Sequence, residues 1–194
     1  MKRLLLLLML LPAVYATSVT PPSFDELVGQ ADLVFRGKVT AVQCGWQGEG
    51  AQRHIATQVT LEVEKPLKGE PPATLTLELM GGEIGGRQLK VLGMPEFAAG
   101  QRGIYFIQNR AGRFCPIMRL RYGRYPIPPA GTQGVERVVR DDNQPLTDVS
   151  AVGEPLIDAS VRSAAEVGGM TLADFEQRIM KRAAELAQGT KAAQ

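Results

Sequence analysis

Histidine is nearly absent from this sequence, which has one, His54, among 194 residues. A zinc site normally needs about three or four His, Cys or carboxylate ligands at set spacings, and no H-E-x-x-H is present. A Ser–His–Asp set would have to use His54, yet no G-x-S-x-G elbow occurs. We therefore expect His54 to face solvent, and a hydrolase that uses it is only an alternative function.

Long apolar runs are absent beyond the N-terminus. Residues 4–11 form an unbroken apolar run after two basic residues, and the small residues Val14 and Ala16 occupy the −3 and −1 positions of a cleavage site. This run is about half of the ~20 residues needed to span a bilayer. We predict a signal peptide over residues 1–16, no membrane anchor after cleavage, and an extracytoplasmic location, either periplasmic or secreted.

Cysteine is also scarce, because Cys44 and Cys115 are the two present and they form no C-x-x-C motif. In an oxidising compartment such a pair favours one disulfide. Two buried thiols, which behave as small apolar groups, are the alternative. A nucleophilic cysteine paired with His54 would require that the disulfide be absent.

Neither sign of charge is in large excess. The chain has 22 basic and 20 acidic residues, and cleavage of the signal peptide would remove two of the basic ones. A nearly neutral mature chain has no general attraction for nucleic acid or for an acidic membrane surface. We therefore expect another protein or a surface polymer as partner, no nucleic acid and no cofactor, and a monomer.

Alternation of apolar and polar residues is the main pattern that is present, and it indicates strands with one buried face. It is clear over residues 31–43, 54–65 and 73–79. Further strands are predicted at 87–92, 103–108 and 114–122, with a hairpin of 135–140 and 145–149. Residues 103–108 are apolar on both faces, which is typical of a doubly covered strand.

Two helices are predicted at the ends of the mature chain. Residues 23–29 begin with the capping-box pair Ser23 and Glu26. Residues 171–187 have an apolar stripe at helical spacing, with Thr171 as the N-cap. The fold class is therefore mainly β, and the strand pattern predicts one domain built as a small antiparallel β-barrel, followed by an amphipathic helix.

The glycine-rich stretch of residues 81–101 raises the question of a phosphate-binding loop. A P-loop needs G-x-x-x-x-G-K-[ST] before a helix, and a dinucleotide fingerprint needs G-x-G; neither is present. Strand patterns flank the glycines instead. We predict tight turns here, so that replacing Gly82 or Gly86 by valine should damage folding.

Arginines and aromatic residues alternate over residues 112–126, in a pattern that can bind single-stranded nucleic acid on small barrels. The near-neutral exported chain favours a simpler interpretation, an edge hairpin whose charges discourage aggregation, or a surface for an acidic protein or glycan. The only tryptophan either anchors a ligand or covers the barrel end. The candidate binding surface is Trp46, Arg119, Arg121, Tyr122 and Arg124.

Two adjacent carboxylates, Asp141 and Asp142, lie in the predicted hairpin turn. Aspartate is favoured in turns because its side chain bonds to the local backbone. The segment lacks the alternating acidic ligands of a calcium loop. We therefore interpret both aspartates as turn residues.

Several segments together resemble a family of uncharacterised secreted bacterial proteins: ADLVFRGKVTAV, EKPLKGE, GGEIGGRQLKVLGMPEFAAGQRGIYFI, VERVVRDDNQPLTD and MTLADFEQRI. The resemblance covers nearly the whole mature chain and implies no activity. The first of these segments is also similar to the first barrel strand of netrin-like domains and tissue inhibitors of metalloproteinases. That similarity implies an OB-like barrel. Those inhibitors act through an N-terminal cysteine, whereas this mature chain would begin at Thr17.

The sequence therefore favours an exported, non-enzymatic binding module consisting of one domain over residues 17–194. A secreted protease inhibitor or protease accessory protein is the first alternative, from the netrin-like similarity. A hydrolase that uses His54 is the second.

Overall fold

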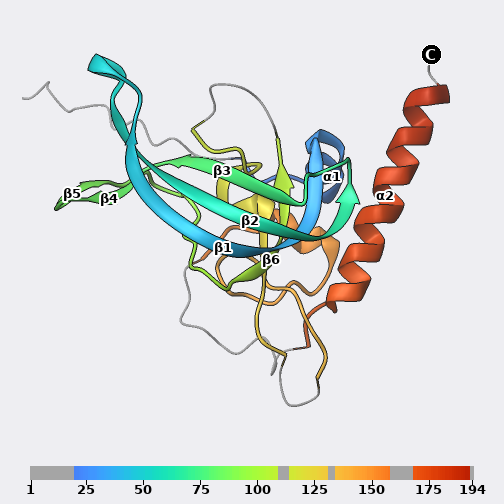
Figure 1. The fold of residues 1–194 in the computed structure, drawn as a ribbon. Helices are drawn as coiled ribbons and strands as arrows, with labels where there is room; N and C mark the ends of the chain where they lie inside the picture. Colours follow the sequence, from blue (N-terminus) through green and yellow to red (C-terminus); the bar gives the residue numbers. More distant parts are fainter. Residues whose placement is uncertain (1–19, 109–113, 131–133, 158–167, 193–194) are drawn as a thin grey trace, which may run out of the picture.

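The computed structural model describes residues 20–108, 114–130, 134–157 and 168–192, so the predicted signal peptide lies outside it. The chain forms a curved five-stranded antiparallel sheet in the order β3–β2–β1–β6–β7 (Figure 1). Its strands are β1 (Leu33–Gln47), β2 (His54–Lys68), β3 (Thr74–Met80), β6 (Arg102–Ile107) and β7 (Arg124–Ile127). The predicted mainly-β class is confirmed.

A small hairpin and two helices complete the fold. The hairpin is made of β4 (Gly82–Ile84) and β5 (Arg87–Leu89), and the helices are α1 (Phe24–Gln30) and α2 (Leu172–Ala192). Single 3-10 turns occupy Gly50–Gln52, Leu120–Gly123 and Val149–Gly153. Both predicted helices are therefore confirmed, and α2 continues beyond residue 187.

The caps of the two helices match the sequence prediction. Ser23 Oγ accepts the N–H of Glu26 at 3.1 Å, and Glu26 accepts the N–H of Ser23 at 2.7 Å. At the start of α2, Thr171 Oγ1 accepts the N–H of Asp174 at 3.1 Å. These short-range bonds satisfy N–H groups that a helix leaves unpaired, which is why local sequence suffices to predict them.

The sheet is open, and a closed barrel is not shown. Its outer strands are β3 and β7, and one backbone bond, from Met80 N–H to Phe114 C=O at 2.8 Å, joins β3 to the chain that follows β6. The predicted strand over 114–122 is wrong for most of its length. Arg119 and Leu120 take left-handed φ values of 49° and 59°, and a 3-10 turn follows, so a continuous closing strand cannot form here.

Two further strand predictions are corrected. The strand expected at 87–92 is shortened to β5, which pairs with β4 in a separate two-stranded sheet. The hairpin of 135–140 and 145–149 is reduced to an isolated bridge between Val139 and Pro145. Pro145 has no N–H to donate, which limits regular pairing at this position.

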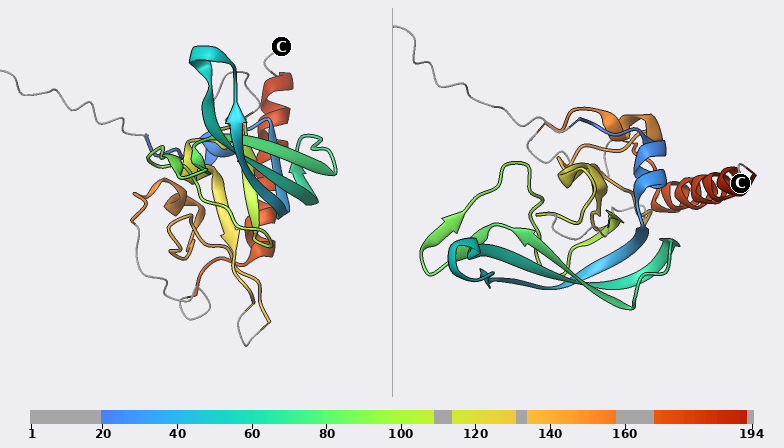
Figure 2. Two further views of the ribbon diagram at one scale, coloured as in Figure 1. Left: turned by 60° about the vertical axis from the view of Figure 1, so that its left-hand side comes forward. Right: turned by 90° about the horizontal axis from the view of Figure 1, so that it is seen from above.

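The β1–β2 hairpin extends beyond the rest of the sheet. We call its distal part, residues 41–47 and 54–60, the arm; β6 pairs only with residues 33–38 of β1. A register shift between Val39 and Ala41 marks a bulge, and bulges bend and twist the strand that contains them. The arm curves over the β4–β5 hairpin in both views of Figure 2, and these two elements form one end of the molecule.

The core lies on both faces of the sheet. On the helix side, Phe175 of α2 packs against Tyr125, with ring centroids 4.9 Å apart, and against Phe106. On the other side, Tyr105 packs against Phe35 and Phe97. Neighbouring residues of β6 thus belong to opposite clusters, as expected of a doubly covered strand.

A chain of ion pairs ties α2 to the sheet. Glu176 is buried on α2, where it binds Arg36 Nη1 at 2.7 Å and Lys65 Nζ at 2.5 Å. Arg36 Nε also contacts Glu64 at 2.9 Å, and Glu64 in turn binds Arg102. A carboxylate buried in this way is tolerated because it is paired with cations on two strands.

The glycine-rich stretch forms the tight turns predicted for it. Gly85 and Gly86 have φ values of 58° and 74° and connect Ile84 to Arg87, as in a two-residue hairpin turn with positive φ at both positions. Gly82 serves a different purpose. A Cβ at this position would lie 2.6 Å from Thr57 Oγ1 and 2.8 Å from Cys44 Sγ, because β4 passes directly over the arm.

Replacing each of the two glycines by valine should lower the free energy of unfolding by a different amount. Both Gly82→Val and Gly86→Val place a branched residue at positive φ, which costs roughly 1–2 kcal/mol. Gly82→Val also creates the clash with the arm, which adds about 1–3 kcal/mol, whereas a Cβ at Gly86 meets open space. Urea unfolding of the purified variants should therefore show the larger loss of unfolding free energy for Gly82→Val. Equal losses would contradict the close approach of β4 to the arm.

Candidate binding groove

Two adjoining hollows lie beside the loop that connects β5 to β6. One has a volume of about 870 Å³ and is lined by arginines and prolines; we call it the arginine hollow. The other has a volume of about 520 Å³ and lies between the arm, the β4–β5 hairpin and residues 90–97; we call it the apolar hollow. Met94, Glu96 and Arg121 line both hollows, so we treat the two as one groove.

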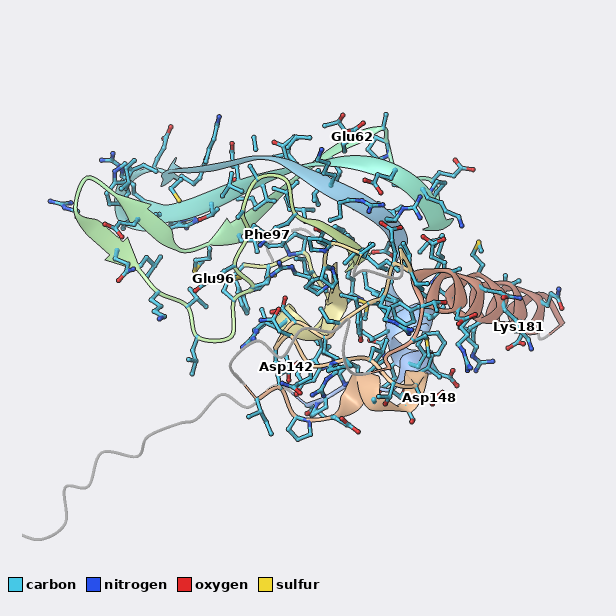
Figure 3. The ribbon with its side chains drawn as sticks, turned by 90° about the horizontal axis from the view of Figure 1, so that it is seen from below. Glu62, Glu96, Phe97, Asp142, Asp148 and Lys181 are labelled. Atoms are coloured by element: carbon cyan, nitrogen blue, oxygen red, sulfur yellow. The ribbon has the colours of Figure 1, made fainter. Side chains whose placement is uncertain are left out.

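The apolar hollow has an aliphatic and aromatic floor, and charged side chains such as Glu83 and Lys90 also line it. Its lining includes Val42, Leu79, Leu89, Leu92, Met94 and Phe97. Phe97 lies close beneath the sheet and Glu96 farther out on the same loop (Figure 3). Leu92 is 90% exposed, whereas Val42, Met94 and Phe97 pack against the core. The hollow thus has a rigid floor and an apolar lip that the protein itself leaves uncovered.

A buried carboxylate organises the arginine hollow. Asp141 lies between two guanidinium groups, with its Oδ2 2.7 Å from Arg121 Nε and its Oδ1 2.8 Å from Arg124 Nη1. The side chains of Asp141 and Arg124 are 3% and 8% exposed. Two cations around one carboxylate leave a local surplus of positive charge, and low solvent exposure makes this charge act more strongly than it would at the surface.

Arg124 also fixes the opposite wall. Its Nη1 donates to the carbonyl of Glu96 at 2.6 Å, and its Nη2 donates to Gln101 Oε1 at 3.0 Å. The guanidinium carbon lies 4.6 Å from the centroid of the Phe97 ring, within cation–π distance. Arg124 thereby connects the loop before β6, the start of β7 and the turn that carries Asp141.

A tight turn positions the two adjacent aspartates. Arg140 N–H donates to Gln144 C=O at 2.8 Å, and Asn143 takes a positive φ of 62°. Asp142 binds Arg140 at 3.0 Å and accepts the N–H of Gln144, whereas Asp141 binds the arginines of the groove. The prediction of turn residues is confirmed, and each carboxylate has the further role of pairing with a different arginine.

The environment shifts the pKa of Asp141 and of Tyr105, which lies beside Arg124. Burial raises the pKa of Asp141, and although the Arg124 and Arg121 guanidinium groups oppose it, the pKa stays above its usual value. Burial also raises the pKa of Tyr105 to about 12. The Tyr105 hydroxyl therefore stays protonated at neutral pH. In the described part of the chain, no group of three or more His, Cys, Asp or Glu side chains is placed to hold a metal ion.

The chain matches no protein-family model, no curated protein and no solved structure. The two family resemblances therefore stay predictions. What can be said of function rests on the groove.

The structure separates the residues of the predicted binding surface. Arg121 and Arg124 line the groove, but Arg124 is buried and Arg121 is paired with Asp141. Arg119 is exposed and Tyr122 is half-buried; neither lines the two hollows. Trp46 lies at the end of the arm, where the Arg53 guanidinium covers its ring at 4.6 Å. The five residues therefore do not form one continuous surface.

Cys44 and Cys115 are not bonded to each other in the structure, and the disulfide stays a prediction. Cys44 is exposed on the arm, lines the apolar hollow and has its Sγ 3.3 Å from Thr57 Oγ1. Cys115 is buried among the core side chains on the groove side of the sheet. His54 is half-buried at the start of β2, with Nδ1 2.9 Å from the carbonyl of Gln52.

Sequence reasoning missed two parts of the site. The first is the loop lip with Leu92, for which a leucine followed by the turn residues Gly93 and Pro95 was the available sequence signal. The second is the pairing of Asp141 with the arginines. Both segments were singled out, but nothing in their local sequence indicated that they meet.

The pairing of Asp141 with Arg121 and Arg124 predicts a large loss of stability for the isosteric change Asp141→Asn. Asp141→Asn leaves the buried Arg124 without its carboxylate, which typically costs about 3–5 kcal/mol for a buried pair that loses one partner. The matched control is Glu154→Gln, because Glu154 is 63% exposed and lies 3.4 Å from Arg140; its effect should stay within about 0.5 kcal/mol. Denaturant unfolding measures both, and a wild-type midpoint for Asp141→Asn would show that the pairing is not needed.

Proposed function

We propose that this protein is an exported, non-enzymatic binding module, and that its groove holds part of another protein or of a surface polymer. The observation that supports this proposal most is that the apolar hollow and the arginine hollow adjoin. They share the lining residues Met94, Glu96 and Arg121. Concave sites with apolar walls and a few fixed polar groups are the usual form of ligand sites. The volumes suit a short stretch of a larger ligand.

The proposed location is extracytoplasmic, on the basis of the N-terminal sequence pattern. No helix among the described residues is long and apolar enough to cross a membrane. An OB-like arrangement of the strands is part of the same proposal. The hydrogen bond from Met80 to Phe114 marks the point where the outer strand β3 meets the chain that follows β6.

The geometry favours binding over the two alternatives. His54 lies at the start of β2 and is absent from the lining of both hollows, so a hydrolase would have to work away from the groove. Protease inhibition of the metalloproteinase-inhibitor type would depend on the mature N-terminus, and residues 1–19 lie outside the described part of the chain. No observation in the groove supports either function.

Capture from an extracytoplasmic extract tests the proposed function. Immobilised mature protein should retain a partner, and Leu92→Glu should lower its recovery at least about tenfold, which corresponds to roughly 1.4 kcal/mol. The control is Ile157→Glu, because Ile157 is 67% exposed and lines neither hollow. Quantitative mass spectrometry of the retained proteins and polysaccharide analysis provide the readout. A partner retained equally by both variants would place binding elsewhere, and no retained partner at all would remove the proposal.

A further inference from the structure

We infer that residues 41–47 of β1, which we call the arm edge, pair antiparallel with the same residues of a second copy of this chain. The inference goes beyond the proposed function, because it concerns an edge of the sheet and not the contents of the groove. It replaces the monomer expected from the sequence by a two-fold symmetric dimer.

The arm edge has a strand partner on one side only. Residues 41–47 pair with β2. On the other side, the last contact is at Val39, which donates to Gln101 C=O and accepts the N–H of Gly100, both at 2.8 Å. Beyond Val39, the described residues provide no backbone partner on that side. Every second residue of a strand directs its N–H and C=O to one side, so the arm edge presents a row of unpaired backbone groups.

The arm edge also lacks the features that normally keep another strand away. Its sequence, AVQCGWQ, contains no charged residue and no proline. The two outer strands of the sheet differ in this respect. The strand β7 contains Pro126, whose carbonyl accepts the N–H of Val139 at 3.0 Å, and β3 carries Glu78 and bonds to Phe114 at its end. Charges, prolines and covering segments are the usual protection of sheet edges, so the arm edge is the one left open among the described strands.

A second copy of the same edge provides a matching partner. When residues 41–47 pair with themselves in antiparallel order, the two-fold axis passes at Cys44, and Val42 lies opposite Trp46 of the second copy. Both side chains are half-buried, so each has surface left to cover. A pair of a β-branched and an aromatic residue contributes about 0.2–1 kcal/mol, and it occurs twice by symmetry. No two like charges face each other in this arrangement.

The position of the arm leaves space for the second copy. In Figure 1 the arm extends away from α1 and α2, at the opposite side of the molecule. A two-fold dimer uses each arm edge once, so the pairing ends at two copies, as in most symmetric oligomers. Val42 and Cys44 also line the apolar hollow. The symmetric pairing therefore brings the apolar hollows of both copies to the same face, beside the two-fold axis.

Sedimentation equilibrium of the mature protein tests for the dimer. A pairing of seven residues is a small interface, so we expect a dissociation constant of about 10–100 µM. A bis-maleimide, which joins two thiols, locates the contact. It should link two wild-type chains, because Cys44 is exposed and lies at the two-fold axis, whereas Cys115 is buried. The control Cys44→Ser should not be linked.

Two double variants test the register, because Gln43 lies opposite Gly45 of the second copy. In Gln43→Lys/Gly45→Lys, two lysines face each other at both places. In Gln43→Lys/Gly45→Glu, a lysine faces a glutamate at the same two places. Gln43 is exposed and a Cβ at Gly45 meets open space, so both variants should fold, which urea unfolding checks. The first should raise the dissociation constant at least about tenfold, and the second should stay within about threefold of the wild type.

The inference is overturned if the mature protein stays monomeric over this concentration range, if the two double variants dimerise equally well, or if Cys44→Ser is linked as efficiently as the wild type. A monomeric protein that still captures a partner through Leu92 would reject the dimer and keep the proposed function. A dimer that captures no partner would reject the proposed function alone.

Discussion

The buried carboxylate of Asp141 is the interaction on which the groove depends. It holds Arg121 and Arg124, and Arg124 in turn holds the loop at Glu96 and Gln101. These contacts join three separate segments, namely the loop before β6, the continuous stretch of the 3-10 turn and the start of β7, and the turn that follows Val139. Burying such charges is costly, and pairing them with opposite charges offsets part of that cost. The arrangement therefore favours one defined shape for the walls of both hollows.

The rest of the fold presents this cluster beside strands β6 and β7 of the curved sheet. β6 is covered on both faces, by the helices on one side and by Phe97 of the preceding loop on the other, so it gives the groove a rigid base. The arm and the β4–β5 hairpin provide the remaining wall. Gly82 allows these two elements to touch, because no side chain fits between its Cα and the arm. The glycine-rich stretch thus contributes to the site through its shape.

Those features of the fold that depend on near neighbours could be predicted from the sequence. The alternation of apolar and polar residues predicted the longest strands, and the Ser23–Glu26 capping box predicted α1. The strand predicted over residues 114–122 was wrong because the alternation of residue types there resembles that of a strand. Arg119 and Leu120 instead adopt a left-handed backbone conformation, which only tertiary contacts select. The arginine-rich segment and the Asp141 turn were both recognised as unusual. Their pairing was missed because contact across 20 residues depends on the fold and on the direction of a tight turn.

The account's central claim is that ligands bind in this groove, between residues 90–97 and 120–127. Hydrogen–deuterium exchange of the mature protein, with and without its captured partner, tests this most directly. The account predicts slower exchange in both of these segments, with little change at the end of the arm and along α2. Protection confined to the arm or to α2, with unchanged exchange in both groove segments, would contradict it.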